Sequence, residues 1–264
     1  MKIDEIRESF LSYFEGEDHL RMSSSSLIPV GDPTLLLTTA GMVQIKPFFV
    51  GESIPKNPRM TSSQKCFRAV DIEEVGDATH LTFFEMLGNF SVGDYFKKEA
   101  MAYALQFLTE NLNLGIERFA ATAHLSDDDS VKLWIELGIK KDRVFKFGDS
   151  ENWWGPAGQE GPCGPCTELH YDFGQSKGCH QDDCAPNCHH VMNDEGDLCN
   201  RFVELWNVVF MQLYQHIDGN LTPLPSPSVD TGLGLERIVV VTQGVDTIYE
   251  TDIFLPLIRY VEEY

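Results

Sequence analysis

Residues 202–216 read FVELWNVVFMQLYQH, and residues 230–237 read DTGLGLER. The first stretch is long, apolar and rich in β-branched and aromatic residues, which predicts a buried strand. The second places two glycines where a strand gives way to a helix, with Arg237 one turn further on. Glycines there let a ligand approach the backbone closely, and the arginine can reach an anion. The segment is therefore a candidate ligand site; the alternative, which so short a pattern favours when taken alone, is an ordinary helix entry with Asp230 as the cap and Arg237 on the surface.

The segments around these two stretches predict an antiparallel α+β fold. Strands are predicted at residues 64–69 and 81–90 as a hairpin, and at 118–124, 144–147 and 167–173, with a Gly- and Pro-rich loop at 148–166. Helices are predicted at residues 3–15, after Asp94 as N-cap, at 127–137, after 230–237, and at 251–263. Runs of strands interrupted by helices favour this fold class over alternating βαβ units.

Composition limits the classes of partner. The chain has 264 residues, 42% of them hydrophobic, which suffices for one large folded domain. Its formal net charge of −21 argues against attachment to nucleic acid mainly by phosphate neutralisation, and we expect no DNA and no membrane partner. The first residues lack an apolar export segment, so the cytoplasm is the expected location. The seven cysteines are then expected as thiols or metal ligands rather than disulfides.

Three polar positions interrupt the apolar strands. Arg68 lies within the apolar-flanked strand predicted at 64–69, where a guanidinium suits a phosphate or carboxylate ligand; alternatively strand alternation turns it to solvent, or it pairs with Glu73 or Glu85. Glu204 and Asn207 lie three residues apart, so strict alternation places them on opposite faces of a strand. They can serve one site only at a bulge or a strand end. Otherwise they are two satisfied core residues.

Two cysteine patterns predict different structures. Residues 163–166, Cys-Gly-Pro-Cys, have the spacing of a redox dithiol, but a strand rather than a helix is predicted after them, so we prefer a tight loop that shapes a pocket. The polar insert at about 174–200 can supply a structural zinc site, with a flexible loop of incidental cysteines as the alternative. Its possible ligands are Cys179, Cys184, Cys188 and Cys199, with His180, His189 and His190 as substitutes.

Taken together, these motifs resemble the class II aminoacyl-tRNA synthetases, and within them the alanine-specific family. The resemblance is carried by residues 32–36 with 40–42, by 66–69 with 82–90, by 161–168, by 204–207 and by 230–237. It implies an α+β fold: a class II synthetase-like antiparallel sheet of six or seven strands flanked by helices. It also implies that residues 1–264 form one aminoacylation domain with the Cys/His-rich insert.

The resemblance implies a reaction as well. L-alanine and ATP, with Mg²⁺, give alanyl-adenylate and pyrophosphate, and alanine then passes to the acceptor end of tRNA(Ala). Because the sequence ends soon after its third motif, we expect a monomeric catalytic fragment that binds tRNA weakly. The alternative is a stand-alone paralogue that activates an amino acid for another acceptor, or that senses alanine or ATP without catalysis.

The resemblance also assigns roles to residues. Arg68 is expected to bridge the ATP α-phosphate and the alanine carboxylate, Arg237 to lie over the adenine or hold the terminal phosphates, and Asp230 to pair with the ammonium group. Glu204 is expected to bind Mg²⁺. The full ATP set is Arg68, Met86, Phe90, Trp154, Leu205, Trp206, Asn207, Gly234 and Arg237. The alanine set is Arg68, Asn207, Val209, Asp230 and Gly232.

Overall fold

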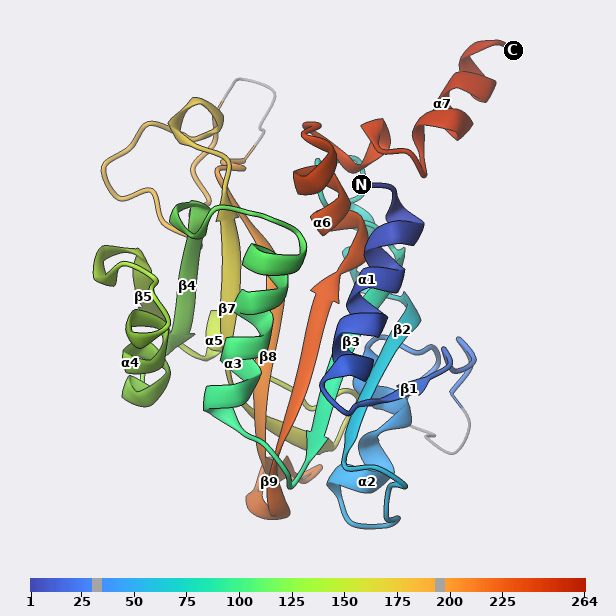
Figure 1. Cartoon of the computed structure of the whole chain (residues 1–264), viewed down its shortest axis with the longest axis vertical. Coiled ribbons are helices and arrows are strands. Elements are labelled where there is room, and N and C mark those ends of the chain that lie inside the picture. Colours follow the sequence, from blue (N-terminus) through green and yellow to red (C-terminus); the bar gives the residue numbers. More distant parts are fainter. Residues whose placement is uncertain (30–34, 193–197) are drawn as a thin grey trace.

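The computed structural model describes residues 1–29, 35–192 and 198–264, and these form a mixed nine-stranded sheet (Figure 1). The strand order is β1-β2-β3-β9-β8-β7-β4-β5, and β6 pairs with β7. The strands are β1 Leu20–Met22, β2 Arg59–Phe67, β3 Phe83–Val92, β4 Phe119–His124, β5 Val144–Phe147, β6 Trp153–Trp154, β7 Gly161–Asp172, β8 Phe202–Gln215 and β9 Leu221–Gly234. The expected antiparallel sheet is confirmed for the centre, whereas the edge pairs β1/β2 and β4/β5 are parallel.

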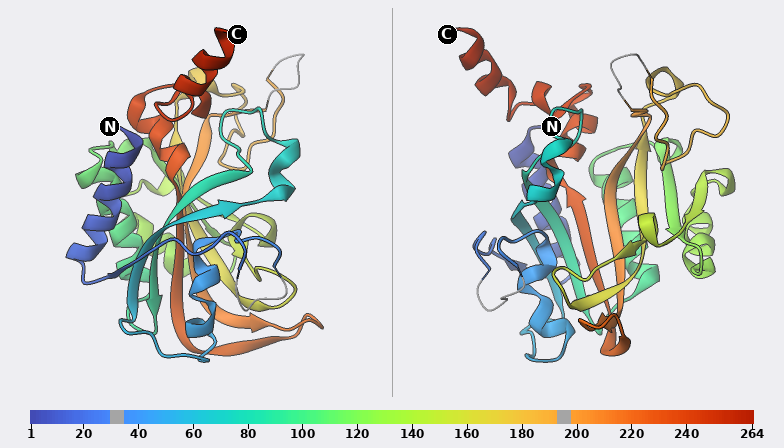
Figure 2. Two further views of the ribbon diagram at one scale, coloured as in Figure 1. Left: turned by 90° about the vertical axis from the view of Figure 1, so that its right-hand side faces the viewer. Right: turned by 180° about the vertical axis from the view of Figure 1, so that it is seen from behind.

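The sheet separates two hydrophobic cores, each covered by helices. The helices are α1 Ile3–Gly16, α2 Lys46–Phe49, α3 Lys97–Gln106, α4 Asp128–Glu136, α5 Asp149–Asn152, α6 Leu235–Gln243 and α7 Leu255–Glu262, and short helical turns include η1 Gly41–Gln44 and η2 Ala69–Glu73. The larger core lies between the sheet and α1, α3 and α6, and in it the rings of Phe10 and Trp206 are in contact, with centroids 5.5 Å apart. A smaller core under η1 and α2 lies on the other side of the sheet (Figure 2).

The structure differs from three predictions of local structure. Phe96, not Asp94, is the N-cap of α3, because the Asp94 carboxylate binds Arg59 instead. Residues 148–166 are not all loop, since α5, β6 and the start of β7 lie within them. Gly164 allows β7 to lie close to β8, because a Cβ atom at this position would be 2.1 Å from the Phe210 carbonyl oxygen. The last helix begins at Leu255, with Pro256 in its first turn, rather than at Thr251.

A β-bulge in the central strand β8 determines which side chains share a face. Leu169 of β7 pairs with Trp206, but the next residue, His170, pairs with Glu204, so Leu205 is an extra residue. One extra residue resets the alternation of side chains. Glu204 and Asn207 therefore point to the same side of the sheet, as the bulge alternative required.

The last helix stands apart from the sheet. In Figure 1 α7 extends away from the rest of the molecule, and none of its residues is buried. Among the described residues, no helix is long and apolar enough to cross a bilayer. Residues 32–34 of the first motif lie outside the described ranges.

Candidate active site

A cavity of about 190 Å³ opens over strands β3, β9, β8 and β7, on the side of the smaller core. Most of the predicted site residues line it: Arg68, Met86, Trp154, Glu204, Leu205, Asn207, Val209, Asp230, Gly232, Gly234 and Arg237. The side chains of two other predicted ATP-binding residues do not line this cavity. Phe90 is buried beneath η1, with its ring against Gly41, and Trp206 is buried in the larger core on the opposite face.

Strand register places residues of this cavity directly opposite one another at two successive positions on the same face of the sheet. Asn207 of β8 lies opposite Glu168 of β7 on one side and Gly232 of β9 on the other. Val209 lies at the next of these positions and is opposite Asp230. Directly opposite residues in a sheet have Cβ atoms about 4.5–5.5 Å apart, so side chains from three strands converge on one small volume.

Arg68 lies just beyond β2 and faces the cavity. Its Nε donates to the Thr39 carbonyl oxygen at 2.9 Å, and its guanidinium lies over the Phe84 ring, 5.3 Å from the centroid. The alternative partner Glu85 instead accepts two hydrogen bonds of 2.7 Å from Arg7. No carboxylate among the described residues lies within ion-pair distance of Arg68. Its charge is therefore available to an anion in the cavity.

Asp230 supplies a buried negative charge to the same cavity. The residue is 5% exposed, and within the described part of the chain no group donates a hydrogen bond to its carboxylate. Burial raises the pKa of Asp230 to about 8, although the nearby charge of Arg68 acts in the opposite direction. A cation bound beside Asp230 would favour its ionised form.

Asn207 is held with its carbonyl oxygen free. Its Nδ2 donates to Glu168 Oε1 at 3.0 Å, so the amide cannot be reversed without losing this bond, and its buried Oδ1 has no partner. Glu168 also accepts from Thr122 Oγ1 at 3.1 Å and lies 3.1 Å from His170 Nε2. Burial and the charge of Glu204 raise the pKa of Glu168. Asn207 thus presents an acceptor whose position Glu168 fixes.

Glu204 and Arg237 form an ion pair at one end of the cavity. Arg237 Nη1 donates to Glu204 Oε2 at 3.0 Å and to the Glu204 carbonyl oxygen at 3.1 Å. Although burial acts in the opposite direction, the charge of Arg237 holds the pKa of Glu204 below its ordinary value. Glu204 is therefore ionised, and only one of its carboxylate oxygens is bound by Arg237.

Sequence reasoning missed several residues of this cavity. Glu168 belongs to a quoted motif but was not assigned a role, although an acidic residue in an apolar strand is a detectable signal. Glu236 also lines the cavity; its carboxylate accepts a hydrogen bond from the Glu85 amide at 3.0 Å, and burial raises its pKa to about 7. Phe84 gave no signal, because an aromatic residue in a strand is usually a core residue.

A larger cavity of about 510 Å³ adjoins the first. The two share Thr79, His80, Glu168, Glu204 and Arg237. The far side of the larger cavity is lined by the insert, through residues that include Cys188, His189 and Cys199. The cysteine-rich insert therefore borders the space next to the site.

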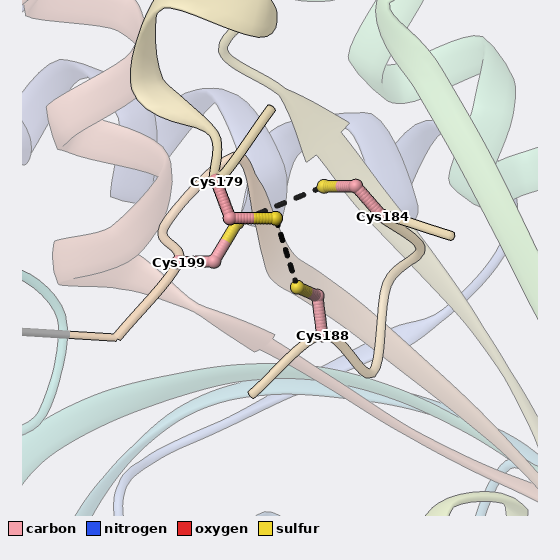
Figure 3. Close-up of side chains that lie close together, drawn as sticks. All are labelled: Cys179, Cys184, Cys188 and Cys199. Carbon is pink, nitrogen blue, oxygen red and sulfur yellow. Dashed lines mark hydrogen bonds between the residues drawn. The ribbon is translucent and has the colours of Figure 1, made fainter. Parts of the chain in front are cut away.

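The four cysteines of the insert lie together, as Figure 3 shows. Their Sγ atoms are all within 4.8 Å of one another, with 3.5 Å between Cys179 and Cys188 and 3.7 Å between Cys184 and Cys199. Of the three histidines, His190 is the one with an Nδ1 atom against the cluster, 3.4 Å from Cys179 Sγ. By contrast, Cys163 and Cys166 are buried in β7, and burial raises the pKa of both, which disfavours a redox role.

The chain is similar to synthetases in sequence and in fold. The family model described as tRNA synthetases class II (A) matches residues 5–264. Alanine–tRNA ligase from Dehalococcoides mccartyi is 54% identical over 256 residues, covering 97% of this chain and 28% of that protein. The enzymes of the same name from Rubrobacter xylanophilus and Treponema denticola are 50% and 45% identical, over 100% and 99% of this chain and 30% and 43% of theirs.

A solved structure supports the fold alone. Histidyl-tRNA synthetase from S. aureus is 12% identical to this chain, with a TM-score of 0.51, and the match covers 94% of this chain and 67% of that one. The chain thus spans less than half the length of the three curated relatives named above.

Proposed function

The chain belongs to the class II tRNA synthetases, and from this premise we propose that it activates L-alanine with ATP and passes the alanine to tRNA(Ala). One observation carries the proposal. Arg68 and Asp230, neither of which has an ion-pair partner among the described residues, line the same small cavity. A zwitterionic amino acid needs one cation for its carboxylate and one anion for its ammonium group, and this pair supplies both.

The cavity suits a small amino acid. In the proposal the ammonium group binds Asp230 and the free Oδ1 of Asn207, and the carboxylate binds Arg68. The methyl group lies against Val209 and Gly232. Space there is limited, because a Cβ on Gly232 would already lie 2.9 Å from Met86 Sδ. A larger side chain would require Met86 to move.

The reaction is a displacement at phosphorus. A carboxylate oxygen of alanine attacks the α-phosphorus of ATP, the bond to the bridging oxygen breaks, and pyrophosphate leaves with that electron pair. No general base is needed, since the attacking carboxylate is already ionised. Arg68 stabilises the charge on the α-phosphate and aligns the two substrates, which is where most of the acceleration of such a reaction arises. Arg237 and Trp154 hold the nucleotide.

Magnesium fits this site through Glu204. Carboxylate oxygens are the protein ligands that Mg²⁺ prefers, and Glu204 is ionised with one oxygen not bound to Arg237. When bound beside Glu204, the metal would offset the negative charge that the phosphates carry. The four cysteines of the insert are soft ligands and fit a different ion, zinc, in a structural role.

The charging of tRNA is a further part of the proposal with its own test. Transfer of labelled alanine to tRNA(Ala) measures it directly. With a net charge of −21 we expect weak tRNA binding by this chain, because few cations are available for its phosphates. The substrates ATP and tRNA also make the cytoplasm the proposed location.

Exchange of labelled pyrophosphate into ATP tests the activation step. We expect exchange with alanine and not with valine or leucine, and none without Mg²⁺. A folded preparation that shows no alanine-dependent exchange would overturn the proposal. Calorimetry on the same preparation then separates a sensor, which binds alanine or ATP without exchange, from a protein that binds neither. Arg259→Ala, on the exposed helix α7, is the matched control and should exchange normally.

A further inference from the structure

The cysteine cluster has the dimensions of a tetrahedral metal site. With Zn–S bonds of about 2.3 Å, four sulfur ligands at the corners of a tetrahedron are about 3.8 Å apart. The Sγ–Sγ separations of 3.5 and 3.7 Å lie close to this value, and no two of the four Sγ atoms are more than 4.8 Å apart. In Figure 3 the four side chains point toward a common centre from separate parts of the insert.

The backbone of the insert is folded around these cysteines. The amides of Cys184 and Cys188 close turns by donating to the carbonyl oxygens of Gln181 and Ala185. The amide of Cys199 donates to the backbone carbonyl oxygen of His190. Apolar residues of the insert, such as Val191 and Leu198, are exposed, so the described part of this segment is not organised around a hydrophobic core of its own. Something other than apolar burial must hold the sulfur atoms together.

We propose that Cys179, Cys184, Cys188 and Cys199 bind a structural Zn²⁺ ion and make the insert a zinc knuckle. Four thiolates fill the coordination shell, so no position remains for a substrate. His190 does not complete the shell but lies beside it: its Nδ1 is 3.4 Å from Cys179 Sγ and 3.5 Å from Cys188 Sγ, where an N–H can donate to thiolate sulfur. Soft sulfur ligands select zinc over the Mg²⁺ of the catalytic site.

The knuckle connects two strands that carry site residues. It leaves the sheet after β7, which ends at Asp172, and returns at β8, which begins at Phe202. The strand ends are clamped by Arg201, whose Nε and Nη2 bind the Asp172 carboxylate at 2.9 and 3.0 Å. Because Cys188 and Cys199 line the larger cavity together with Glu204, the metal also fixes one wall of that cavity.

Disulfides are the competing arrangement for the same sulfur atoms. Both sulfur pairs are far longer than a disulfide bond of about 2.05 Å, and all seven cysteines are free. Oxidation would still give the pairs 179–188 and 184–199. Mass spectrometry of the alkylated protein, which distinguishes thiols from disulfides, therefore belongs in the test.

Metal analysis tests the proposal on the whole chain without any activity assay. Protein from zinc-supplemented medium, purified without chelator, should contain one zinc per chain. Replacement by Co²⁺ should give the visible bands of tetrahedral cobalt and a near-ultraviolet charge-transfer intensity typical of four thiolates. Zinc well below one equivalent, or the two disulfides found by mass spectrometry, would overturn the proposal. An intensity typical of three thiolates would overturn the four-cysteine shell in favour of His190 as a ligand.

Two further measurements separate a lost metal site from a lost fold. Cys184→Ser should lower the zinc content, while Cys163→Ala, which removes a thiol outside the cluster, should keep one equivalent. On the wild-type chain, zinc removal should accelerate tryptic cleavage at Lys177 and Arg201, which flank a stretch without lysine or arginine. Unchanged cleavage after removal would refute a structural role. None of these results depends on the pyrophosphate exchange that tests the proposed function.

Discussion

Asp230→Asn should change the dependence of stability on pH in a defined direction. The pKa of Asp230 is raised from 3.8 to about 8 by burial. Between these two values the native, ligand-free protein carries a proton that the unfolded chain has released. Because the native carboxyl group keeps its proton to a higher pH than the unfolded one, the free energy of unfolding falls by about 1.4 kcal/mol per pH unit across this range. Above about pH 8 this contribution no longer changes. Asparagine has no such dependence.

The expected magnitude follows from that slope. From pH 5 to pH 7 the wild-type protein should lose about 2.7 kcal/mol relative to Asp230→Asn. At roughly 2–4 °C per kcal/mol for a domain of this size, the gap between their melting temperatures should widen by about 5–11 °C. Glu236, whose pKa burial also raises, is present in both proteins and cancels in the difference. Thermal or urea unfolding at pH 5, 6 and 7 measures the gap, and a gap that stays constant would refute the reasoning.

The same carboxylate should release a proton when alanine binds. With a pKa of about 8, Asp230 is about nine-tenths protonated at pH 7, and pairing with an ammonium group requires the ionised form. Calorimetry in buffers of different ionisation enthalpy should therefore detect close to one proton released per alanine. Asp230→Asn should release none and should not support exchange. Alanine binding to the wild type without proton release would show that the ammonium group lies elsewhere.

Three other substitutions probe the site by pyrophosphate exchange. Arg68→Ala should lower the exchange rate by a factor of about 10²–10³, since it removes the charge at the α-phosphate, whereas Lys65→Ala, exposed on β2 three residues before Arg68, should leave it unchanged. Gly232→Ala should raise the KM for alanine with a smaller effect on the KM for ATP, because the added methyl group meets Met86. Glu168→Gln should raise the KM for alanine more than it lowers kcat, because a glutamine no longer fixes the amide of Asn207 in one orientation.

The larger elements of this fold could be predicted because their signals are local. The strand at 144–147 and the helix at 127–137 are confirmed, with each end within one residue of its predicted position. Asp127 is the N-cap of this helix, and its carboxylate accepts a hydrogen bond from the Ser130 amide. The start of β7 was missed for a physical reason. Gly161 and Pro162 read as loop residues, but they pair with Gln215 and Tyr214, and such pairing between distant segments leaves no trace in the local sequence.

Prediction of the site depended on the resemblance more than on the residues alone. From the residues, Arg68 could bind a ligand, or it could face solvent or pair with Glu73 or Glu85. In the structure it lines the cavity, and Glu85 is bound by Arg7 instead. The resemblance named whole motifs and so included Phe90 and Trp206, which are core residues. A motif is a continuous run of residues. Only those of its residues that lie on the strand face bordering the cavity, and that no other segment covers, can line the cavity.

The bulge at Leu205 shows why the sequence could state alternatives but could not choose between them. Alternation along one strand is a property of that strand, and by it Glu204 and Asn207 diverge. A bulge is a property of two strands, because an extra residue is defined only against the partner, here the step from Leu169 to His170 in β7. Without it, Glu204 would leave the cavity for the face of the larger core, where an ionised side chain next to Trp206 would be costly. The proposed magnesium ligand and the proposed alanine ligand thus share one cavity because of a single unpaired residue.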